Sequence, residues 1–211
     1  MSRRLALLLP LVLCACQKGP DPQQLNASAQ FFLDNGGLTL LSRTGQAGTQ
    51  PCLKPLNMKQ TLLGGPFGAS ERLVDFVERH QLAKTRHEQR PSGYEGVTFT
   101  PVAPYENNWV GQGDYKNFCF GKITLVKAEA VPDAKTITAG EAEPYIIPGT
   151  EARATRITYR LEDVPGGSFV DDLKAAPNLL VRGSLLPKSY GKDLTVVATL
   201  PLKPENFNVK P

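Results

Sequence analysis

The alternation of apolar and polar residues predicts β-strands through the second half of the chain. The predicted strands span residues 97–102, 118–130, 155–161 and 194–200. In the third of them, Ile157, Tyr159 and Leu161 alternate with polar residues, which is the pattern of an antiparallel strand with one buried face. The second is long enough to need a bend, and Gly121 can supply it.

Apolar residues at helical spacing predict one main helix at about residues 70–83. Ser70 suits the N-cap, and Glu71 suits the first turn, where a negative charge interacts favourably with the helix dipole. The residues expected on the buried stripe of this helix are Leu73, Phe76, Val77 and His80. The helix should therefore pack one face against the core.

A short helix is expected at about residues 168–176, because Ser168 to Asp171 resembles a capping box and Pro177 must end the helix. Helices and strands that do not alternate regularly indicate an α+β fold built on an antiparallel sheet. The chain length fits a single domain, which we expect to cover residues 25–211.

Elsewhere the pattern is weaker. It predicts a short helix at 30–34, a short strand at 38–41 and a loop at 44–51. Two longer irregular stretches follow at 103–117 and 131–153. The second contains the apolar residues Tyr145 to Ile147, which we expect to form a flap over the core, with an edge strand or a partner-binding segment as alternatives.

The amino terminus begins with Arg3 and Arg4, followed by an apolar run from Leu5 to Leu13. This run is shorter than the roughly 20 residues that cross a bilayer, and it ends at Leu13-Cys14-Ala15-Cys16. The stretch resembles the lipobox of bacterial lipoprotein precursors. The resemblance implies that residues 1–15 are a signal peptide and that Cys16 carries a thioether-linked diacylglycerol and an acylated amino group.

Two alternatives to this interpretation remain. Cys14 could be the modified residue, although Leu13 would then be a poor cleavage residue, or the leader could be an ordinary secreted or uncleaved one. With Cys16 lipidated, residues 16–24 would form the lipidated cysteine and a polar tether. By the same resemblance, Gln17 in place of aspartate favours the outer membrane, facing the periplasm, while Lys18 weakens that inference in some bacterial groups.

Removal of residues 1–15 leaves 196 residues and lowers the formal charge from +4 to +2, because Arg3 and Arg4 are lost. A chain so close to neutrality gives no electrostatic argument for a nucleic-acid partner. The membrane, reached through the lipid anchor, is the first partner that the sequence predicts.

Cys52 and Cys119 remain in the exported part, and in an oxidising compartment such a pair most simply forms a disulfide. The bridge would close a loop of about 68 residues and stabilise the fold by about 4 kcal/mol on the chain-entropy model. Two separate buried thiols are the alternative. A redox role is not indicated, because no Cys-x-x-Cys motif is present.

Catalytic and metal-binding motifs are not found in the sequence, and no cofactor is predicted. His80 and His87 are its only histidines, and neither belongs to a His-Glu-x-x-His motif. The basic residues at and beyond the end of the main helix are Arg79, Lys84, Arg86 and Arg90. They could bind an anionic glycolipid or polymer, but we favour a helix end and solvated loop.

The stretch 103–117 contains Tyr105, Trp109 and Tyr115 among small polar residues, a composition suited to stacking on sugars or contacting a protein. A single tryptophan is more often an anchor in a core or loop. The sequence therefore favours a non-catalytic lipoprotein that binds or scaffolds an envelope protein or glycan. An envelope hydrolase, or an inhibitor of one, acting through residues 103–117, is the alternative.

Overall fold

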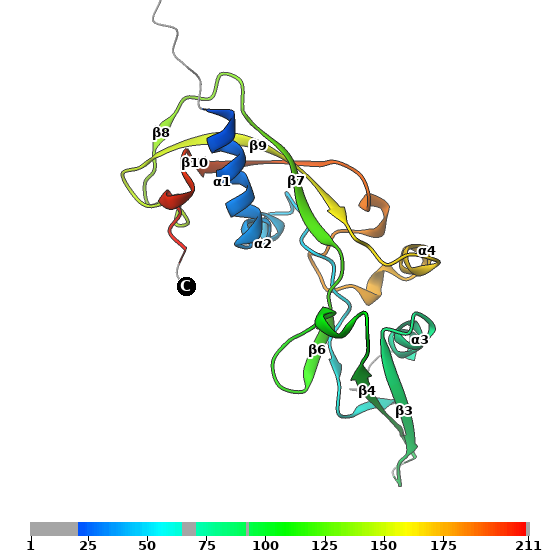
Figure 1. Ribbon diagram of the computed structural model, residues 1–211. Coiled ribbons are helices and arrows are strands. Elements are labelled where there is room, and N and C mark those ends of the chain that lie inside the picture. The colour runs from blue at the N-terminus through cyan, green and yellow to red at the C-terminus, as the bar shows by residue number, and fades with distance from the viewer. Residues whose placement is uncertain (1–20, 65–70, 92, 210–211) are drawn as a thin grey trace, which may run out of the picture.

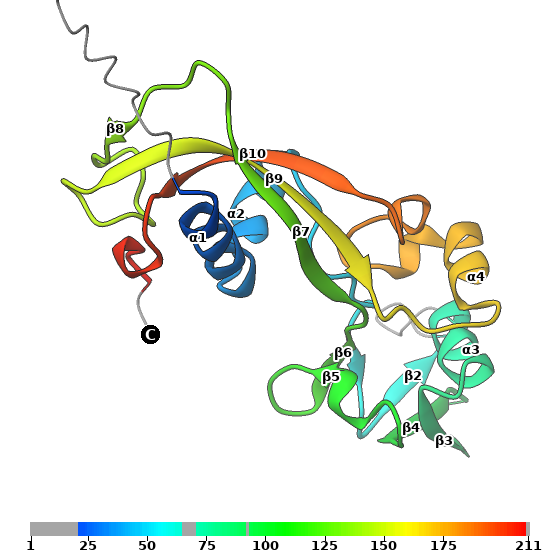
Figure 2. The same cartoon turned by 45° about the horizontal axis from the view of Figure 1, so that its top comes forward.

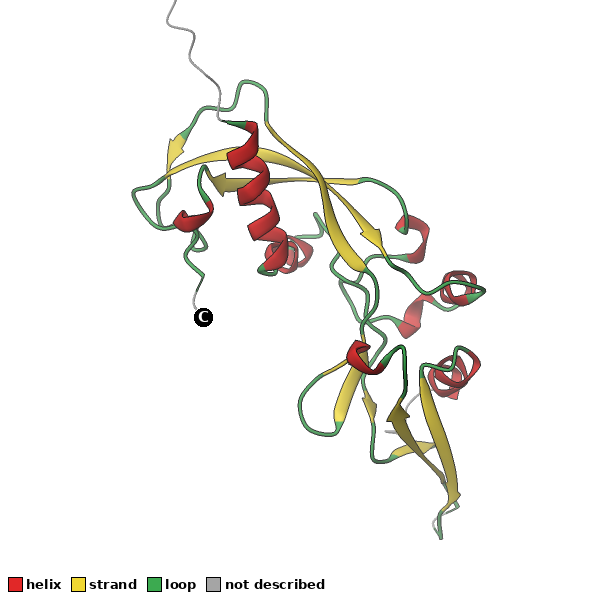
Figure 3. Cartoon of the chain, viewed as in Figure 1, coloured by secondary structure: helices red, strands yellow, loops and turns green. Residues whose placement is uncertain are grey.

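A computed structural model describes residues 21–64, 71–91 and 93–209 (Figure 1). It confirms the predicted fold class, because helices and antiparallel sheets make up an α+β fold (Figure 3). The elements form two lobes. The sheet lobe consists of α1, α2, β7, β8, β9 and β10, and the α3 lobe consists of β1 to β6, α3 and α4.

An antiparallel sheet in the order β10-β9-β7 forms the sheet lobe, and β8 pairs with the start of β9. The strands are β7 (Lys122–Ala130), β8 (Ile137–Thr138), β9 (Glu151–Glu162) and β10 (Leu194–Pro201). In the register, Ile157 lies between Val196 on one side and Ala128 on the other. All three are buried, so the alternation read from the sequence corresponds to the inner face of this sheet.

Two helices, α1 (Pro22–Asp34) and α2 (Gly37–Arg43), cover one face of the sheet (Figure 2). Helix α1 buries Leu25, Ala29 and Phe32 against that face. Asp21 caps it, so the helix begins inside the predicted tether of residues 16–24 and is longer than the helix predicted at 30–34. The sequence pattern missed the first two turns because their buried face has only Leu25 beside the small residues Ser28 and Ala29, which leave a weak apolar stripe.

Helix α2 replaces the strand predicted at 38–41. Gly36 has a φ of 75°, a left-handed conformation that glycine adopts readily, and it separates α2 from α1. Leu38 and Leu41, three residues apart, both pack toward the sheet, while Leu40 is exposed. This is helical spacing, which a run of four residues cannot distinguish from a strand.

The α3 lobe contains two small antiparallel sheets, in the orders β2-β4-β3 and β1-β6-β5. Its elements are β1 (Leu56–Asn57), β2 (Thr61–Leu63), α3 (Glu71–Arg79), β3 (Ala83–Gln89), β4 (Glu95–Pro101), β5 (Trp109–Val110), β6 (Tyr115–Phe118) and α4 (Phe169–Ala175). Helices α3 and α4 pack their apolar faces into one core together with residues of these strands.

Helix α3 confirms the main predicted helix and its buried residues Leu73, Phe76 and Val77, but it ends at Arg79 rather than near Ala83. Gln81 has a φ of 51°, which turns the chain into β3. Strand β3 lies where a solvated loop was expected, and it includes Lys84 and Arg86. The predicted N-cap, Ser70, lies outside the described residues.

Helix α4 confirms the short helix, which ends before Pro177 as expected. The Ser168 side chain makes no capping hydrogen bond. Its Oγ donates instead to Asp172 Oδ2 at 3.4 Å, so the predicted capping box does not form. Among the described residues, no helix is both long enough and apolar enough to cross a bilayer.

The segment 131–153, predicted as a flap, adds β8 and the first residues of β9 to the edge of the sheet lobe. Ile146 is fully buried and forms an isolated bridge with Phe207. The Tyr145 hydroxyl donates to the Thr199 carbonyl at 2.9 Å. These contacts hold the segment against the sheet lobe.

Candidate functional site

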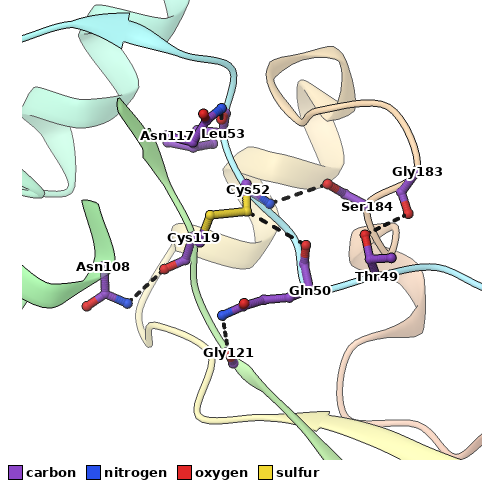
Figure 4. The surroundings of a disulfide bond; sticks show 10 residues. All are labelled: Thr49, Gln50, Cys52, Leu53, Asn108, Asn117, Cys119, Gly121, Gly183 and Ser184. Atoms are coloured by element: carbon purple, nitrogen blue, oxygen red, sulfur yellow. Dashed lines mark hydrogen bonds between the residues drawn. A yellow bond between two sulfur atoms is a disulfide. The ribbon is translucent and has the colours of Figure 1, made fainter. Parts of the chain in front are cut away.

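Cys52 and Cys119 form the predicted disulfide at the junction of the two lobes (Figure 4). Cys52 follows α2 and leads into the α3 lobe, whereas Cys119 follows β6 and leads back into the sheet lobe. The two crossing segments also exchange backbone hydrogen bonds, from Leu53 to Phe118 at 2.8 Å and from Phe120 to Pro51 at 3.1 Å. The disulfide therefore joins the segments that connect the lobes.

Side-chain hydrogen bonds reinforce this junction (Figure 4). Gln50 Nε2 donates to the Gly121 carbonyl at 2.8 Å, and the Cys52 amide donates to Ser184 Oγ at 3.3 Å. Val164 and Tyr190 each pack against both the α3-lobe core and a sheet-lobe core. Packing, hydrogen bonds and a covalent bond thus hold the lobes together.

The three aromatic residues predicted to bind a ligand do not form a common surface. Trp109 is 6% exposed and belongs to the core, and Tyr105 is partly buried against it. Both rings contact Phe118 edge-on. Tyr115 is 61% exposed. The expected sugar-stacking platform is therefore divided between the core and the surface.

The stretch 103–117 is also more regular than expected, because it contains a short 3-10 helix, β5 and the start of β6. Val110 and Tyr115 flank the turn between β5 and β6, and Val110 is 55% exposed. A β-carbon at Gly111 would lie 2.3 Å from the Tyr115 carbonyl oxygen, so this turn requires glycine. The turn presents two large exposed side chains on a hairpin.

His87 lies between two carboxylates that come from different elements. Its Nε2 is 2.5 Å from Glu78 Oε1 on α3, and its Nδ1 is 2.6 Å from Glu95 Oε1 on β4. His87 and Glu95 line a surface cavity of about 600 Å³, together with Glu71, Asp75 and Tyr94 among others. A second cavity of about 250 Å³ in the α3 lobe is lined by residues that include Arg79 and Asp172.

The two carboxylates control the charge of His87. Hydrogen bonds to Glu78 and then Glu95 raise the pKa of His87 above its usual value, which favours the doubly protonated imidazolium. Burial opposes ionisation of Glu78, but hydrogen bonds from His87 and Thr85 outweigh it and lower the Glu78 pKa. Because a carboxylate occupies each ring nitrogen, the arrangement is an ion-pair clamp rather than a free general base.

This cluster could hardly be predicted from the sequence. His87 pairs with Val97 in the β3–β4 register. Glu95 lies two residues before Val97 on β4, so it is a diagonal neighbour of His87. That relationship appears only once β3 is recognised as a strand. Glu78 comes from the helix, and no local sequence pattern connects it to His87.

His80 occupies a separate site between α3 and α4. Its Nε2 is 2.9 Å from Asp172 Oδ2, and its ring packs against Phe76 and Phe169. Burial of the Asp172 carboxyl is outweighed by the His80 hydrogen bond and the charge of Arg79, which lower its pKa. The Ser168 hydroxyl contacts Asp172 rather than the His80 imidazole. A serine nucleophile would have to contact the histidine, so these three residues join two helices and do not form a catalytic triad.

The basic residues beyond α3 are largely paired with acids. Arg79 forms an ion pair with Asp172 at 3.4 Å. The Glu88 carboxylate forms ion pairs with Arg86 at 2.6 Å and with Arg90 at 3.6 Å. The charges of these three arginines are partly neutralised, which weakens the anion-binding alternative, whereas Lys84 has no ion pair among the described residues. Within the described ranges, no group of three or more His, Cys, Asp or Glu side chains is placed to hold a metal ion.

Comparisons with known proteins identify no relative of this chain. No family model matches it, and no curated protein or solved structure is significantly similar to it. Function is therefore inferred from the residues themselves. Cys16 and the tether up to residue 20 lie outside the described residues, so the lipid anchor remains a prediction.

Proposed function

We propose that this protein is a lipid-anchored bacterial envelope lipoprotein that binds or scaffolds a periplasmic partner without catalysis. The disulfide between Cys52 and Cys119 is the observation that carries the proposal. Structural disulfides persist in oxidising compartments and are rare in the cytosol, so the bridge agrees with the export signal that ends at Cys16. The outer membrane, facing the periplasm, is the proposed location.

The arrangement of the histidines supports a non-catalytic role. His87 is engaged by carboxylates at both ring nitrogens, and His80 is bonded to Asp172 and packed on phenylalanine rings. A general base must lie within hydrogen-bond reach of a substrate proton, and these contacts serve the fold instead. The contacts of the two histidines thus argue against a hydrolase that uses a histidine as its general base.

The α3 lobe offers the better surface for a protein or glycan partner. Val110 and Tyr115 are exposed on the β5–β6 hairpin, and Tyr94 is exposed beside the His87 cavity. Tyrosine is enriched at binding surfaces, because its ring supplies contact area and its hydroxyl can donate or accept a hydrogen bond. We assign the binding role to this lobe.

Fatty-acid labelling tests the proposed anchor. The full chain is expressed in a Gram-negative host with an alkyne-tagged fatty acid, alongside Cys16→Ser and Cys14→Ser. We expect Cys16→Ser to lose the label, because it removes the proposed acceptor, and Cys14→Ser to keep it. Both variants retain the disulfide cysteines, so the domain itself is unchanged. Absence of label from the unmodified chain would contradict the proposal, and loss only in Cys14→Ser would move the anchor to that residue.

Inhibition of an envelope hydrolase is a second candidate function, favoured by the exposed pair on the β5–β6 hairpin. A projecting loop can insert into a concave surface of its target, and an inhibitor could use the hairpin in this way. Pull-down from envelope extracts separates the two functions, since an inhibitor should recover one enzyme and a scaffold several structural proteins. Tyr115→Ser should abolish recovery by an inhibitor, whereas Val197→Ser, at an exposed apolar position of the sheet lobe, should not.

A further inference from the structure

The start of α1 leaves little chain between the domain and the proposed lipid anchor. The Asp21 side chain accepts a hydrogen bond from the Gln23 amide at 3.0 Å, and Pro22 is the first residue of the helix. Only four residues, 17–20, lie between Cys16 and Asp21, and the five Cα–Cα steps of a fully extended chain span no more than about 18 Å. The inference below rests on the proposed lipidation of Cys16.

The attachment point is fixed to the sheet lobe. Leu25 and Ala29 are buried against the sheet, and Asn26 Oδ1 accepts a hydrogen bond of 2.9 Å from the Ala128 amide on β7. The first turns of α1 are therefore packed on the end of β7. The anchor cannot move away from the sheet lobe without breaking these contacts.

The junction between the lobes holds the α3 lobe in place relative to the sheet lobe. The disulfide, the Gln50 hydrogen bond and the residues shared between cores restrict how the α3 lobe can rotate relative to α1. Figure 1 and Figure 2 both place the beginning of α1 and the β3–β4 hairpin at opposite ends of the molecule. Even a compact chain of this length has a radius of gyration of about 16 Å. The tether, which reaches at most about 18 Å, is therefore shorter than the distance across the molecule.

We propose that the sheet lobe is the membrane-proximal part of the protein, with the first turn of α1 and the end of β7 facing the lipid leaflet. The α3 lobe is presented away from that leaflet. The exposed Tyr115 and the cavity beside His87 lie on this distal lobe. Their partner must therefore approach from the aqueous side and not from the lipid surface to which the protein is attached.

Energy transfer to the bilayer tests this orientation. Gln24→Cys on α1 and Gln89→Cys on β3 place a single thiol at an exposed position on each lobe. The full chain is labelled with a donor fluorophore and reconstituted into phosphatidylethanolamine–phosphatidylglycerol vesicles containing a headgroup acceptor. We expect transfer at least about twofold more efficient from residue 24 than from residue 89, given the short tether and the length of the molecule.

The chain without an added thiol separates the two failures. If Cys16 is lipidated and Cys52 and Cys119 are bonded, that chain takes up no label and sediments with the vesicles. Labelling of that chain, together with its recovery in the soluble fraction, would overturn both the proposed anchor and the orientation. Equal transfer from residues 24 and 89 in a vesicle-bound protein would overturn the orientation alone, because the molecule would then lie flat or rotate freely.

A longer tether supplies the matched control. Inserting 20 Gly and Ser residues after Gly19 adds a flexible segment with a typical span of about 25 Å, and it leaves the lipobox and the domain unchanged. The difference between the two labelled positions should then shrink. A difference that persists undiminished would overturn the short tether as the cause of the orientation, although the sheet lobe would still be the membrane-proximal part.

Discussion

Trp109 Nε1 donates a hydrogen bond of 2.9 Å to the carbonyl oxygen of Leu82. Leu82 lies in the turn between α3 and β3, 27 residues earlier in the chain, and both residues are buried. The bond therefore fixes the β5–β6 hairpin to the turn that follows the main helix. The only tryptophan of the chain has a structural role in this core.

Trp109→Phe should destabilise the protein by about 1–3 kcal/mol, because the buried Leu82 carbonyl loses its donor while an aromatic ring still fills the space. Urea unfolding followed by far-ultraviolet circular dichroism measures the change without relying on tryptophan fluorescence. Tyr115→Phe, at the exposed position, should change stability by less than about 0.5 kcal/mol. A larger effect at Tyr115 than at Trp109 would contradict this assignment.

Replacing Cys52 and Cys119 together by serine should lower the free energy of unfolding by about 4 kcal/mol. The two cysteines are 67 residues apart, and opening a loop of that size restores the conformational entropy of the unfolded chain. Urea unfolding of the double variant measures the loss, and reduction of the unmodified protein should reproduce most of it. An unchanged midpoint in both experiments would rule out a stabilising disulfide.

Elements with one buried face could be predicted from the sequence, because burial leaves a periodic pattern. Strand β9 and helix α3 are examples, since buried residues such as Ile157 and Phe76 recur at the spacing of a strand and of a helix. Strand β3 left no such pattern. It is an edge strand in which most side chains are polar and exposed, and its pairing with β4 defines it.

The candidate site could be predicted only in part, for a related reason. The disulfide followed from counting cysteines, but burial of Trp109 depends on Leu82 and Phe118, which lie elsewhere in the chain or on the opposing strand. The clamp around His87 requires three elements to meet. Residue type restricts what such side chains can do, and tertiary contacts decide which of them reach the surface.

Gly121→Ala should be strongly destabilising. Gly121 has a φ of 71° at the predicted bend before β7, and a β-carbon there would lie 2.7 Å from Leu161 Cδ1. The left-handed conformation alone costs about 1–2 kcal/mol for a residue with a β-carbon, and the clash adds to it. Gly113→Ala, with a φ of 58° but open space around it, should show only the conformational cost in thermal or urea unfolding. Equal losses in both variants would contradict a packing role for Gly121.

The clamp around His87 should make stability depend on pH in a defined direction. Hydrogen bonds to Glu78 and Glu95 raise the His87 pKa, so its contribution is complete below the unfolded value of about 6.5 and is lost as pH rises through the folded value. The lowered Glu78 pKa gives the opposite limit, with stability lost as acid protonates that carboxylate. The stability difference between the unmodified protein and His87→Gln should therefore be largest in mildly acidic solution and shrink at alkaline pH. Urea unfolding from pH 4 to pH 10 measures it, with Gln89→Asn on the same strand as a control whose effect should not vary. A difference that grew with rising pH would show that His87 is not held as a cation between these two acids.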